Sequence, residues 1–284
     1  MKILTWNINL GSSLGWNGKK EISKDVVDTV FEKENNNKFD ADIVVLTEFT
    51  ILKGWDYLQD KMLDCGYIWF VTNIPGDNGI LICVKKELIS DKDKTKFINR
   101  IYDNSSGAVQ FSNEKCNLLK ITLPLKSGED LTIIGFRMKT GGLTGQACYD
   151  SERETFYSEL LPHIESVRNE CIVCGDFNNG RCLGDLNKTY DEKDYTGMVQ
   201  RNYNLNIIKD DFSRFGFQML DKKSNSGIGC SFNTWKCVPG KKTFVPDDHI
   251  FVRFNNKTKV SKVEAVDTAY SDHSLLWAKI ESDE

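Results

Sequence analysis

Apolar and polar residues follow short, changing patterns along the chain, and these patterns predict strands interleaved with a few helices. Residues 3–9 alternate as a half-buried strand does, whereas residues 41–46 form the near-continuous apolar run of a strand buried on both faces. Apolar positions recur at helical spacing in residues 21–31 and in residues 151–167. The chain is therefore predicted to be an α/β protein.

Further short apolar segments continue this pattern to the C-terminus. Helices are predicted at residues 55–65 and 194–203, and strands at residues 67–71, 80–84, 118–123, 131–136, 171–174, 232–235, 249–254, 259–266 and 275–280. No linker, low-complexity tract or short repeat is apparent, so residues 1–284 are predicted to form a single domain. Such a series favours sheets packed face to face with helices outside.

Acidic and amide side chains fall where several predicted strands begin or end. They are Asn7, Glu48, Asp176, Asn178, Asp248 and Asp272. Strand ends are where α/β folds place ligands. Each residue taken singly also has a structural explanation, as a turn former or an exposed strand terminus. Only their combination indicates a functional site.

Five short blocks that contain these residues resemble, in order, the motifs of the endonuclease/exonuclease/phosphatase superfamily. The blocks are Thr5-Trp6-Asn7-Ile8-Asn9, Leu46-Thr47-Glu48, Gly175-Asp176-Phe177-Asn178, Asp248-His249-Ile250-Phe251-Val252 and Ser271-Asp272-His273. A single block of this length can match by chance, but a chance match of five blocks in the same order is improbable. The superfamily includes deoxyribonucleases, AP endonucleases, sphingomyelinases and inositol polyphosphate 5-phosphatases. The resemblance implies a four-layer α/β sandwich, in which two packed mixed sheets are flanked by helices.

The resemblance also implies a role for each candidate residue. Glu48 is expected to hold Mg²⁺ or Mn²⁺, with Asn7 beside it as a second ligand or a phosphate contact. Asp272 is expected to help hold the metal or the water, and hard oxygen ligands suit these cations. Asp176 is expected to orient or deprotonate the attacking water. Asn178 is expected to donate a hydrogen bond to the phosphoryl oxygen.

A histidine in the last block completes the implied site. His273 is expected to contact the phosphate or to act as the acid-base group, with Asp248 hydrogen-bonded to its other ring nitrogen. The alternative is a structural histidine, although the chain has only three. His163 is expected on a helix surface. His249 is left out of the site, because many relatives carry Tyr there.

The sequence departs from the family pattern where many relatives place a second histidine. The stretch reads Gly135-Phe136-Arg137-Met138-Lys139-Thr140-Gly141, so arginine occupies that position. Arg137 cannot shuttle a proton near neutral pH, but its guanidinium can clamp a phosphate through two hydrogen bonds. We therefore count Arg137 among the catalytic candidates, with Asp77 or Asn78 as an orienting partner. The alternative is a solvated arginine at a strand end.

Composition limits the partners. The formal net charge of -4 gives no global basic field, so a polyanionic substrate must be met by a local patch or through bound cations. The basic residues predicted in loops near the site are Lys19, Lys20, Lys139, Arg181, Lys241 and Lys242. Together they leave nucleic acid open as a substrate.

The cysteines and the N-terminus bear on the compartment. Nine cysteines are too few for a disulfide scaffold, and Cys171 and Cys174 should face opposite sides of one strand. The chain shows neither the apolar region of a signal peptide nor a run long enough to span a bilayer. A cytoplasmic monomer without a membrane partner is expected.

The sequence thus predicts a divalent-metal-dependent phosphoesterase. Its leading form is a phosphodiesterase or nuclease that cleaves DNA or RNA with an activated water. One alternative is a phosphatase acting on a small phosphorylated molecule such as an inositol phosphate. Another is a catalytically silent binding protein of the same fold, which the arginine substitution alone favours.

Overall fold

The structure is a computed structural model whose described part contains two mixed β-sheets. It describes residues 1–9, 21–31, 39–72, 79–91, 117–138, 154–178, 208–220, 235–238, 241–245, 247–255 and 258–282. The strand order of the first sheet is β12-β13-β1-β2-β4-β3, and that of the second is β5-β6-β7-β11-β8. Strands β9 (Trp235–Val238) and β10 (Lys241–Val245) pair separately as a hairpin.

The first sheet is built mainly from the N-terminal third of the chain and its last two strands. Its members are β1 (Lys2–Asn7), β2 (Ile43–Phe49), β3 (Tyr67–Val71), β4 (Gly79–Lys85), β12 (Thr258–Val266) and β13 (Leu275–Ser282). Strands β1 and β2 are parallel, and the other neighbours are antiparallel. All seven residues of β2 are buried, as its apolar run predicts.

The second sheet comes from the middle of the chain. Its members are β5 (Leu118–Pro124), β6 (Asp130–Arg137), β7 (Glu170–Asp176), β8 (Gln218–Met219) and β11 (Asp248–Arg253). Strands β6 and β7 are parallel, and the remaining pairs are antiparallel. Each sheet therefore contains one parallel pair, whose two carboxyl ends meet at the same edge.

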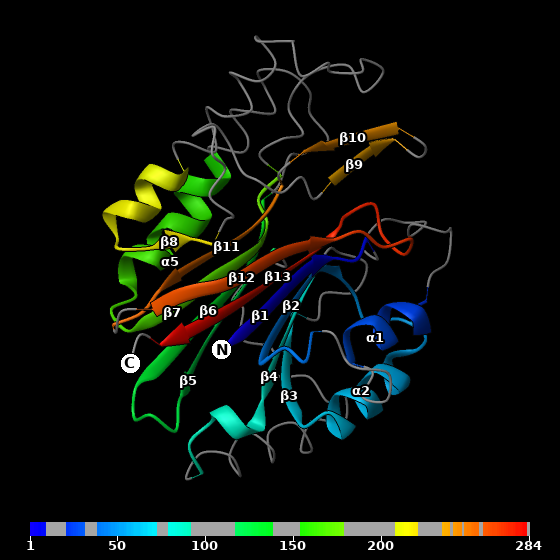
Figure 1. Ribbon diagram of the computed structural model, residues 1–284, viewed down its shortest axis with the longest axis horizontal. Helices are drawn as coiled ribbons and strands as arrows, with labels where there is room; N and C mark the ends of the chain where they lie inside the picture. Colours follow the sequence, from blue (N-terminus) through cyan, green and yellow to red (C-terminus); the bar gives the residue numbers. More distant parts are fainter. Residues whose placement is uncertain are drawn as a thin grey trace.

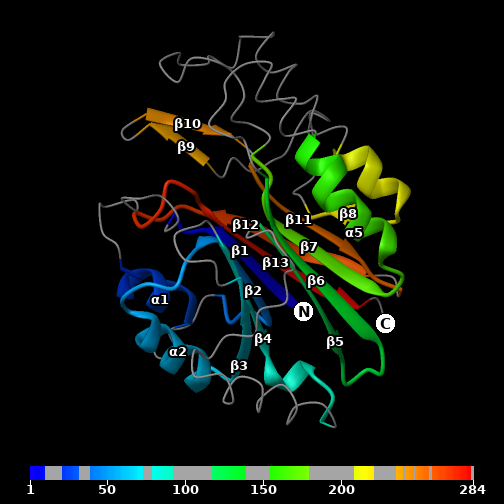
Figure 2. The same ribbon diagram turned by 180° about the vertical axis from the view of Figure 1, so that it is seen from behind.

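Helices cover the outer faces of the two sheets (Figures 1 and 2). The helices α1 (Lys24–Phe31) and α2 (Trp55–Asp64) lie against the first sheet, and the short 3-10 helix η1 (Lys86–Leu88) follows β4. A π-helical turn, η2 (Phe156–Leu160), continues into α5 (Leu161–Ser166) on the second sheet, beside a helix at residues 208–214. The predicted α/β sandwich of two packed sheets flanked by helices is confirmed.

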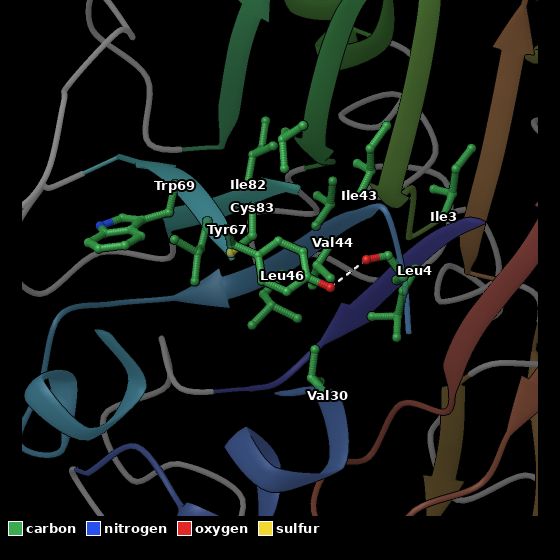
Figure 3. Packing of buried hydrophobic residues seen from close by; sticks show 14 of the residues in the cluster. Ile3, Leu4, Val30, Ile43, Val44, Leu46, Tyr67, Trp69, Ile82 and Cys83 are labelled. Atoms are coloured by element: carbon green, nitrogen blue, oxygen red, sulfur yellow. Dashed lines mark hydrogen bonds between the residues drawn. The ribbon is translucent and has the colours of Figure 1, made fainter. Parts of the chain in front are cut away.

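The strand alternation divides buried side chains between the sheet interface and the helix layer (Figure 3). Ile3 and Ile43 point toward the second sheet, whereas Leu4 and Val44 point toward the side that carries α1. The two sheets approach closely at Gly135. A Cβ atom at Gly135 would lie 2.6 Å from Ile80 Cγ2. A residue with a side chain at this position would therefore push the sheets apart.

Some sequence predictions differ from the structure or fall outside its described part. The helix predicted at residues 194–203 and the first three residues of the strand predicted at 232–235 are not described. The helix at residues 208–214 was not predicted. Lys241 and Lys242 were predicted in a loop but belong to strand β10, so that prediction was wrong. The reason is local, because two adjacent lysines lowered the apolar signal of this short strand.

The buried cysteines behave as predicted from strand geometry. Cys171 packs in the outer core of the second sheet, and Cys174 packs in the core between the sheets. Both are free thiols, and burial raises the pKa of Cys171 to about 12. They fill the core instead of binding a metal together. No helix in the described part of the chain is long and apolar enough to cross a membrane.

Candidate active site

Strand pairing brings the candidate residues of the first sheet to one edge. In the parallel pair, Asn7 at the end of β1 is opposite Thr47 of β2, so Glu48 comes directly beyond it. Strand β13 is antiparallel to β1 and starts at Leu275. The residues just before it, Asp272 and His273, therefore lie at the edge where β1 and β2 end.

The second sheet brings its own candidates together by the same logic. In the parallel pair, Arg137 at the end of β6 is opposite Asp176 at the end of β7. Asp248, the first residue of β11, is opposite Asp176 on the other side. Asn178 follows two residues after Asp176. Arg137, Asp176 and Asp248, which are far apart in sequence, thus become neighbours through backbone pairing alone.

A β-bulge directs the side chain of Glu48. The pairing register of β2 with β4 shifts between Thr47 and Phe49, and Glu48 between them adopts a left-handed backbone with φ of 51°. Few non-glycine residues adopt this conformation, and such strain concentrates at functional sites. The bulge therefore re-aims a buried carboxylate that regular pleating would place differently.

Glycine is required just before Asp176. Gly175 has a φ of 142°, and a Cβ atom there would lie 2.0 Å from the carbonyl oxygen of Phe136. This close approach lets β7 end tightly against β6. The turn continues through Asn178, whose φ of 47° is in the left-handed region that Asn tolerates better than most residues. The Gly-Asp-Phe-Asn block is thus a backbone requirement as well as a chemical motif.

The carboxylate of Asp176 is the centre of the hydrogen-bond network. Asn7 Nδ2 donates to Asp176 Oδ2 at 2.9 Å, and Asn178 Nδ2 donates to the same oxygen at 2.8 Å. The backbone N–H of Asn178 donates to Asp176 Oδ1 at 2.8 Å. The Asn178 amide also donates to the Met138 carbonyl at 2.9 Å. These bonds fix the plane of the Asp176 carboxylate.

His273 is held by a carboxylate on the opposite sheet. Its Nδ1 lies 2.7 Å from Asp248 Oδ2, and its Nε2 lies 3.4 Å from Asn7 Nδ2. The Asp248 side chain is fully covered, so the pair is shielded from water. This arrangement fixes the ring orientation and turns Nε2 toward the centre of the site.

Arg137 pairs with Glu48 across the sheet interface. Its Nε and Nη2 both lie 2.7 Å from Glu48 Oε1, and its Nε lies 3.9 Å from Asp176 Oδ2. The predicted orienting partners Asp77 and Asn78 lie outside the described residues. The arginine is therefore part of the cluster, and Glu48 is a partner that the sequence did not indicate.

Three residues without a predicted role support the cluster. Asn9 Nδ2 donates to Asp272 Oδ1 at 3.1 Å, and its N–H donates to Asn7 Oδ1 at 3.0 Å. Ser271 Oγ donates to the Asn7 carbonyl at 2.6 Å, and Trp6 Nε1 donates to the His273 carbonyl at 3.0 Å. All three belong to the motif blocks, and this membership was the only feature of the sequence that could have indicated their supporting role. The basic residues predicted in loops at 19–20, 139 and 181 are not described.

The charges in this cluster shift two pKa values. Burial raises the pKa of Asp176, as does nearby Asp248, whereas His273 and Arg137 oppose the shift. Burial alone would lower the pKa of His273, but the charge and hydrogen bond of Asp248, with Asp176 and Asp272, raise it to about 10. His273 is therefore an imidazolium at neutral pH.

The donor chemistry of the cluster fits a divalent cation. Four carboxyl groups face one arginine and one imidazolium, which leaves an excess of negative charge when all are ionised. The ligand atoms of Asp176, Asp248 and His273 lie within 4.8 Å of one another, so this group could hold a metal ion. Glu48 and Asp272 add further carboxylate oxygens at the same strand edge, and such oxygens are the ligands that Mg²⁺ prefers.

An α/β sandwich with acidic, amide and histidine side chains at the edge of its parallel strands defines a phosphoesterase-type protein. Residues 4–273 match the Endonuclease/Exonuclease/phosphatase family. The chain belongs to this family, whose members hydrolyse phosphate ester bonds and typically depend on a metal ion. A comparison with curated proteins gives no match.

Solved structures with the same fold include a 3' phosphatase and a 2',3'-cyclic phosphatase. The 3' phosphatase NExo from Neisseria, bound to a product DNA hairpin, has a TM-score of 0.58 and 18% identity, over 99% of each chain. TDP2 from D. rerio, complexed with single-strand DNA product, has a TM-score of 0.56 and 14% identity, over 99% of each chain. ANGEL2, a 2',3'-cyclic phosphatase, has a TM-score of 0.54 and 17% identity, over 98% of this chain and 94% of its own. The TM-scores indicate a shared fold, and at these sequence identities they indicate the fold alone.

Proposed function

We propose that this chain is a divalent-cation-dependent phosphodiesterase that cleaves DNA or RNA with an activated water. The observation that carries the proposal is the Asp176 carboxylate, which accepts three hydrogen bonds from Asn7 and Asn178 beside the His273–Asp248 pair. Any buried carboxylate needs hydrogen-bond donors, but here the donors are two amides of the motif blocks that fix the carboxylate plane beside a charged histidine. A base that must hold a water in line with a phosphorus atom needs such a fixed plane.

Asp176 is the proposed base. Its pKa is raised by burial, so the carboxylate is a better proton acceptor than an exposed aspartate. Asn7 and Asn178 orient it from two directions. For Asn178 to donate to a phosphoryl oxygen as well, one of its two amide hydrogen bonds must be released on substrate binding. Its first role is therefore to position Asp176.

His273 is proposed to act on the opposite side of the phosphate. As an imidazolium, its Nε2–H offers positive charge to a phosphoryl oxygen or a proton to the leaving oxygen. Asp248 keeps the ring charged and oriented through Nδ1. A base on one sheet and an acid on the other suit an in-line displacement of an alcohol by water.

Glu48, the amide oxygen of Asn7 and Asp272 are the residues proposed to hold Mg²⁺ or Mn²⁺. A bound cation would offset the negative charge that develops on the phosphoryl oxygens. Asn9 supports this set, because it hydrogen-bonds both Asn7 and Asp272. Arg137 adds a guanidinium that can contact the phosphate of the substrate.

Nucleic acid is proposed as the substrate on the strength of chemistry in structural relatives. TDP2 and NExo are bound to DNA products, and ANGEL2, a 2',3'-cyclic phosphatase, is bound to adenosine-2',3'-vanadate. The rival proposal, a phosphatase on a small phosphorylated molecule, uses the same site residues. The two proposals differ only in the substrate, so an activity assay decides between them.

The test is a substrate panel with Mg²⁺ or Mn²⁺, and with EDTA as the metal-free control. The panel comprises plasmid DNA, RNA, abasic duplex, a 3'-phosphorylated oligonucleotide and inositol phosphates, each also incubated with Asp176→Asn. Cleavage of a polynucleotide that EDTA and the variant both abolish supports the proposal. Phosphate release from inositol phosphates alone would replace it with the rival, and inactivity throughout would favour a binding protein.

A further inference from the structure

The ion pair between Arg137 and Glu48 occupies the carboxylate that the proposed cation needs. Two nitrogens of the guanidinium converge on a single oxygen, Glu48 Oε1, at 2.7 Å each. Only 12% of the Arg137 side chain and 10% of the Glu48 side chain are exposed. Water therefore screens this pair poorly, and the attraction is stronger than in a surface salt bridge.

The pair is also fixed from both sides by the backbone. Glu48 is on the β-bulge of the first sheet, whereas Arg137 ends β6 of the second sheet opposite Asp176. The same guanidinium approaches Asp176 Oδ2 at 3.9 Å. A positive charge thus already lies between the proposed metal ligand and the proposed base.

A divalent cation at Glu48 must share the carboxylate with this guanidinium or displace it. Sharing brings two positive centres within a few ångströms of each other at a partly buried site, which is unfavourable. Arginine cannot relieve the repulsion by losing a proton, because its guanidinium stays charged at every accessible pH. The side chain must instead move, and the substrate phosphate is an acceptor that matches its planar donors.

We propose that Arg137 competes with the divalent cation for Glu48 and thereby keeps cation affinity low until a phosphate accepts the guanidinium. This inference rests on the proposed function, because it takes Glu48 as a metal ligand. Thermodynamic linkage makes this competition reciprocal. If the Arg137–Glu48 ion pair weakens cation binding, a bound cation weakens the ion pair by the same factor. The opposite role, in which Arg137 holds Glu48 ready for the metal, predicts the opposite change in affinity.

The experiment measures Mn²⁺ binding without substrate, by electron paramagnetic resonance of the free ion and by calorimetry. The proteins compared are the wild type, Arg137→Met, Arg137→Lys and the control Arg214→Met. Arg214 also pairs with a carboxylate, Asp211, at 2.9 Å, but on the helix at residues 208–214. Arg137→Met should bind Mn²⁺ about tenfold tighter or more, which is within the usual range of coupling between sites. Arg137→Lys should be intermediate, and Arg214→Met should match the wild type.

A double variant identifies the site of competition. In the Glu48→Gln background, Arg137→Met should give no gain in Mn²⁺ affinity, because the contested carboxylate is gone. Far-UV circular dichroism confirms folding, and Arg137→Lys decides the direction if Arg137→Met does not fold.

Three results would overturn the inference, and they separate it from the proposed function. Equal or weaker Mn²⁺ binding in Arg137→Met removes the competition but leaves a metal site in place. A gain that persists with Glu48→Gln shows that the arginine acts on another ligand. Failure of the wild type and every variant to bind Mn²⁺ removes both the competition and the proposed metal dependence.

Discussion

The two sheets contribute different chemistry to the site. The first sheet carries the histidine and the oxygen donors proposed for a cation. The second sheet carries the proposed base with its orienting amide, the arginine, and the carboxylate that pairs with the histidine. The first set is Asn7, Glu48, Asp272 and His273, and the second is Arg137, Asp176, Asn178 and Asp248. Neither set alone contains both the proposed base and the proposed cation ligands.

Three side-chain contacts of the site cross from one sheet to the other. They join Asn7 to Asp176 at 2.9 Å, Arg137 to Glu48 at 2.7 Å and His273 to Asp248 at 2.7 Å. The catalytic geometry therefore depends on how the sheets pack as well as on which residues are present. Variants of each sheet should have distinguishable consequences.

The largest effect is expected from removing the base of the second sheet. Asp176→Asn keeps the shape of the side chain but loses its ability to accept a proton. Turnover should fall by about 10²–10⁴-fold, the usual contribution of a positioned acid or base. Mn²⁺ binding should change little, because Asp176 is not a proposed metal ligand. Steady-state kinetics would measure the turnover, and calorimetry would measure the Mn²⁺ binding.

The contrasting variant in the first sheet is Glu48→Gln. Because it weakens a proposed metal ligand, activity should return as the Mg²⁺ concentration is raised. A magnesium titration of both variants separates the two roles. The same magnesium dependence in Asp176→Asn and Glu48→Gln would contradict the division between the sheets.

The next largest effect concerns the arginine that links the sheets. Arg137→Ala should lower the rate by about 10²–10³-fold, as the loss of a donor to the transition state does. Arg137→Lys should keep only part of the activity, since the ammonium group of lysine lacks the planar set of donors of a guanidinium. Arg137→His should make the rate more dependent on pH than that of the parent. A parental rate for Arg137→Ala on the identified substrate would make the arginine a bystander.

A smaller effect is expected from disturbing the packing between the sheets. The Cβ atom of Gly135→Ala would meet Ile80 Cγ2 at 2.6 Å and Val45 Cγ1 at 3.0 Å. Overpacking of this kind costs about 1–3 kcal/mol of the free energy of unfolding. Activity should fall as well, because the contacts between the sheets are displaced. Urea unfolding and turnover would be measured on the same preparations.

The matched control is Gly128→Ala, in the exposed turn between β5 and β6. Gly128 has a φ of 89°, so alanine is strained there, but no atom lies within 4 Å of the added carbon. This variant should lose stability while keeping the turnover of its folded fraction. If Gly135→Ala also keeps full turnover, site geometry does not depend on the packing at that point.

Much of the fold could be predicted because local patterns encode it. The apolar run at residues 41–46 predicts β2, and the helical spacing at residues 21–31 predicts α1, which begins at Lys24. The helix at residues 208–214 was missed, although Ile208 and Phe212 are buried four residues apart. Its apolar stripe is only two turns long, which is too short to stand out against flanking polar residues.

The candidate site could be predicted as a set of residues but not as a geometry. The positions of Asn7, Glu48 and Asp176 follow from the ends of predicted strands. The bulge at Glu48 and its pairing with Arg137 do not, because they depend on register within one sheet and on packing against the other. No local pattern carries either piece of information.

The last prediction concerns the pH dependence of stability, which tests the His273–Asp248 contact between the sheets. Burial alone would lower the pKa of His273, but Asp248 and its neighbours raise it to about 10 in the folded protein, against about 6.5 in an unfolded chain. The folded state keeps a proton that the unfolded state releases, so a rising pH favours unfolding. The contribution of His273 is fully present below about pH 6.5 and is lost as the pH approaches about 10. This pKa shift already includes the cost of burying the charge, which Asp248 and its neighbours outweigh.

Urea unfolding with EDTA, measured from pH 6.5 to pH 10, would show this loss in the difference between the wild type and His273→Gln. The stability advantage of the wild type should shrink across that window. Asp248→Asn should remove most of the dependence, because the ring then loses the carboxylate that holds its proton. Subtracting the pH curve of one protein from that of the other removes the contribution of groups that titrate equally in both. Parallel curves for the wild type and His273→Gln would mean that the histidine is neutral in the folded protein, and that its proton does not hold the two sheets together at the site.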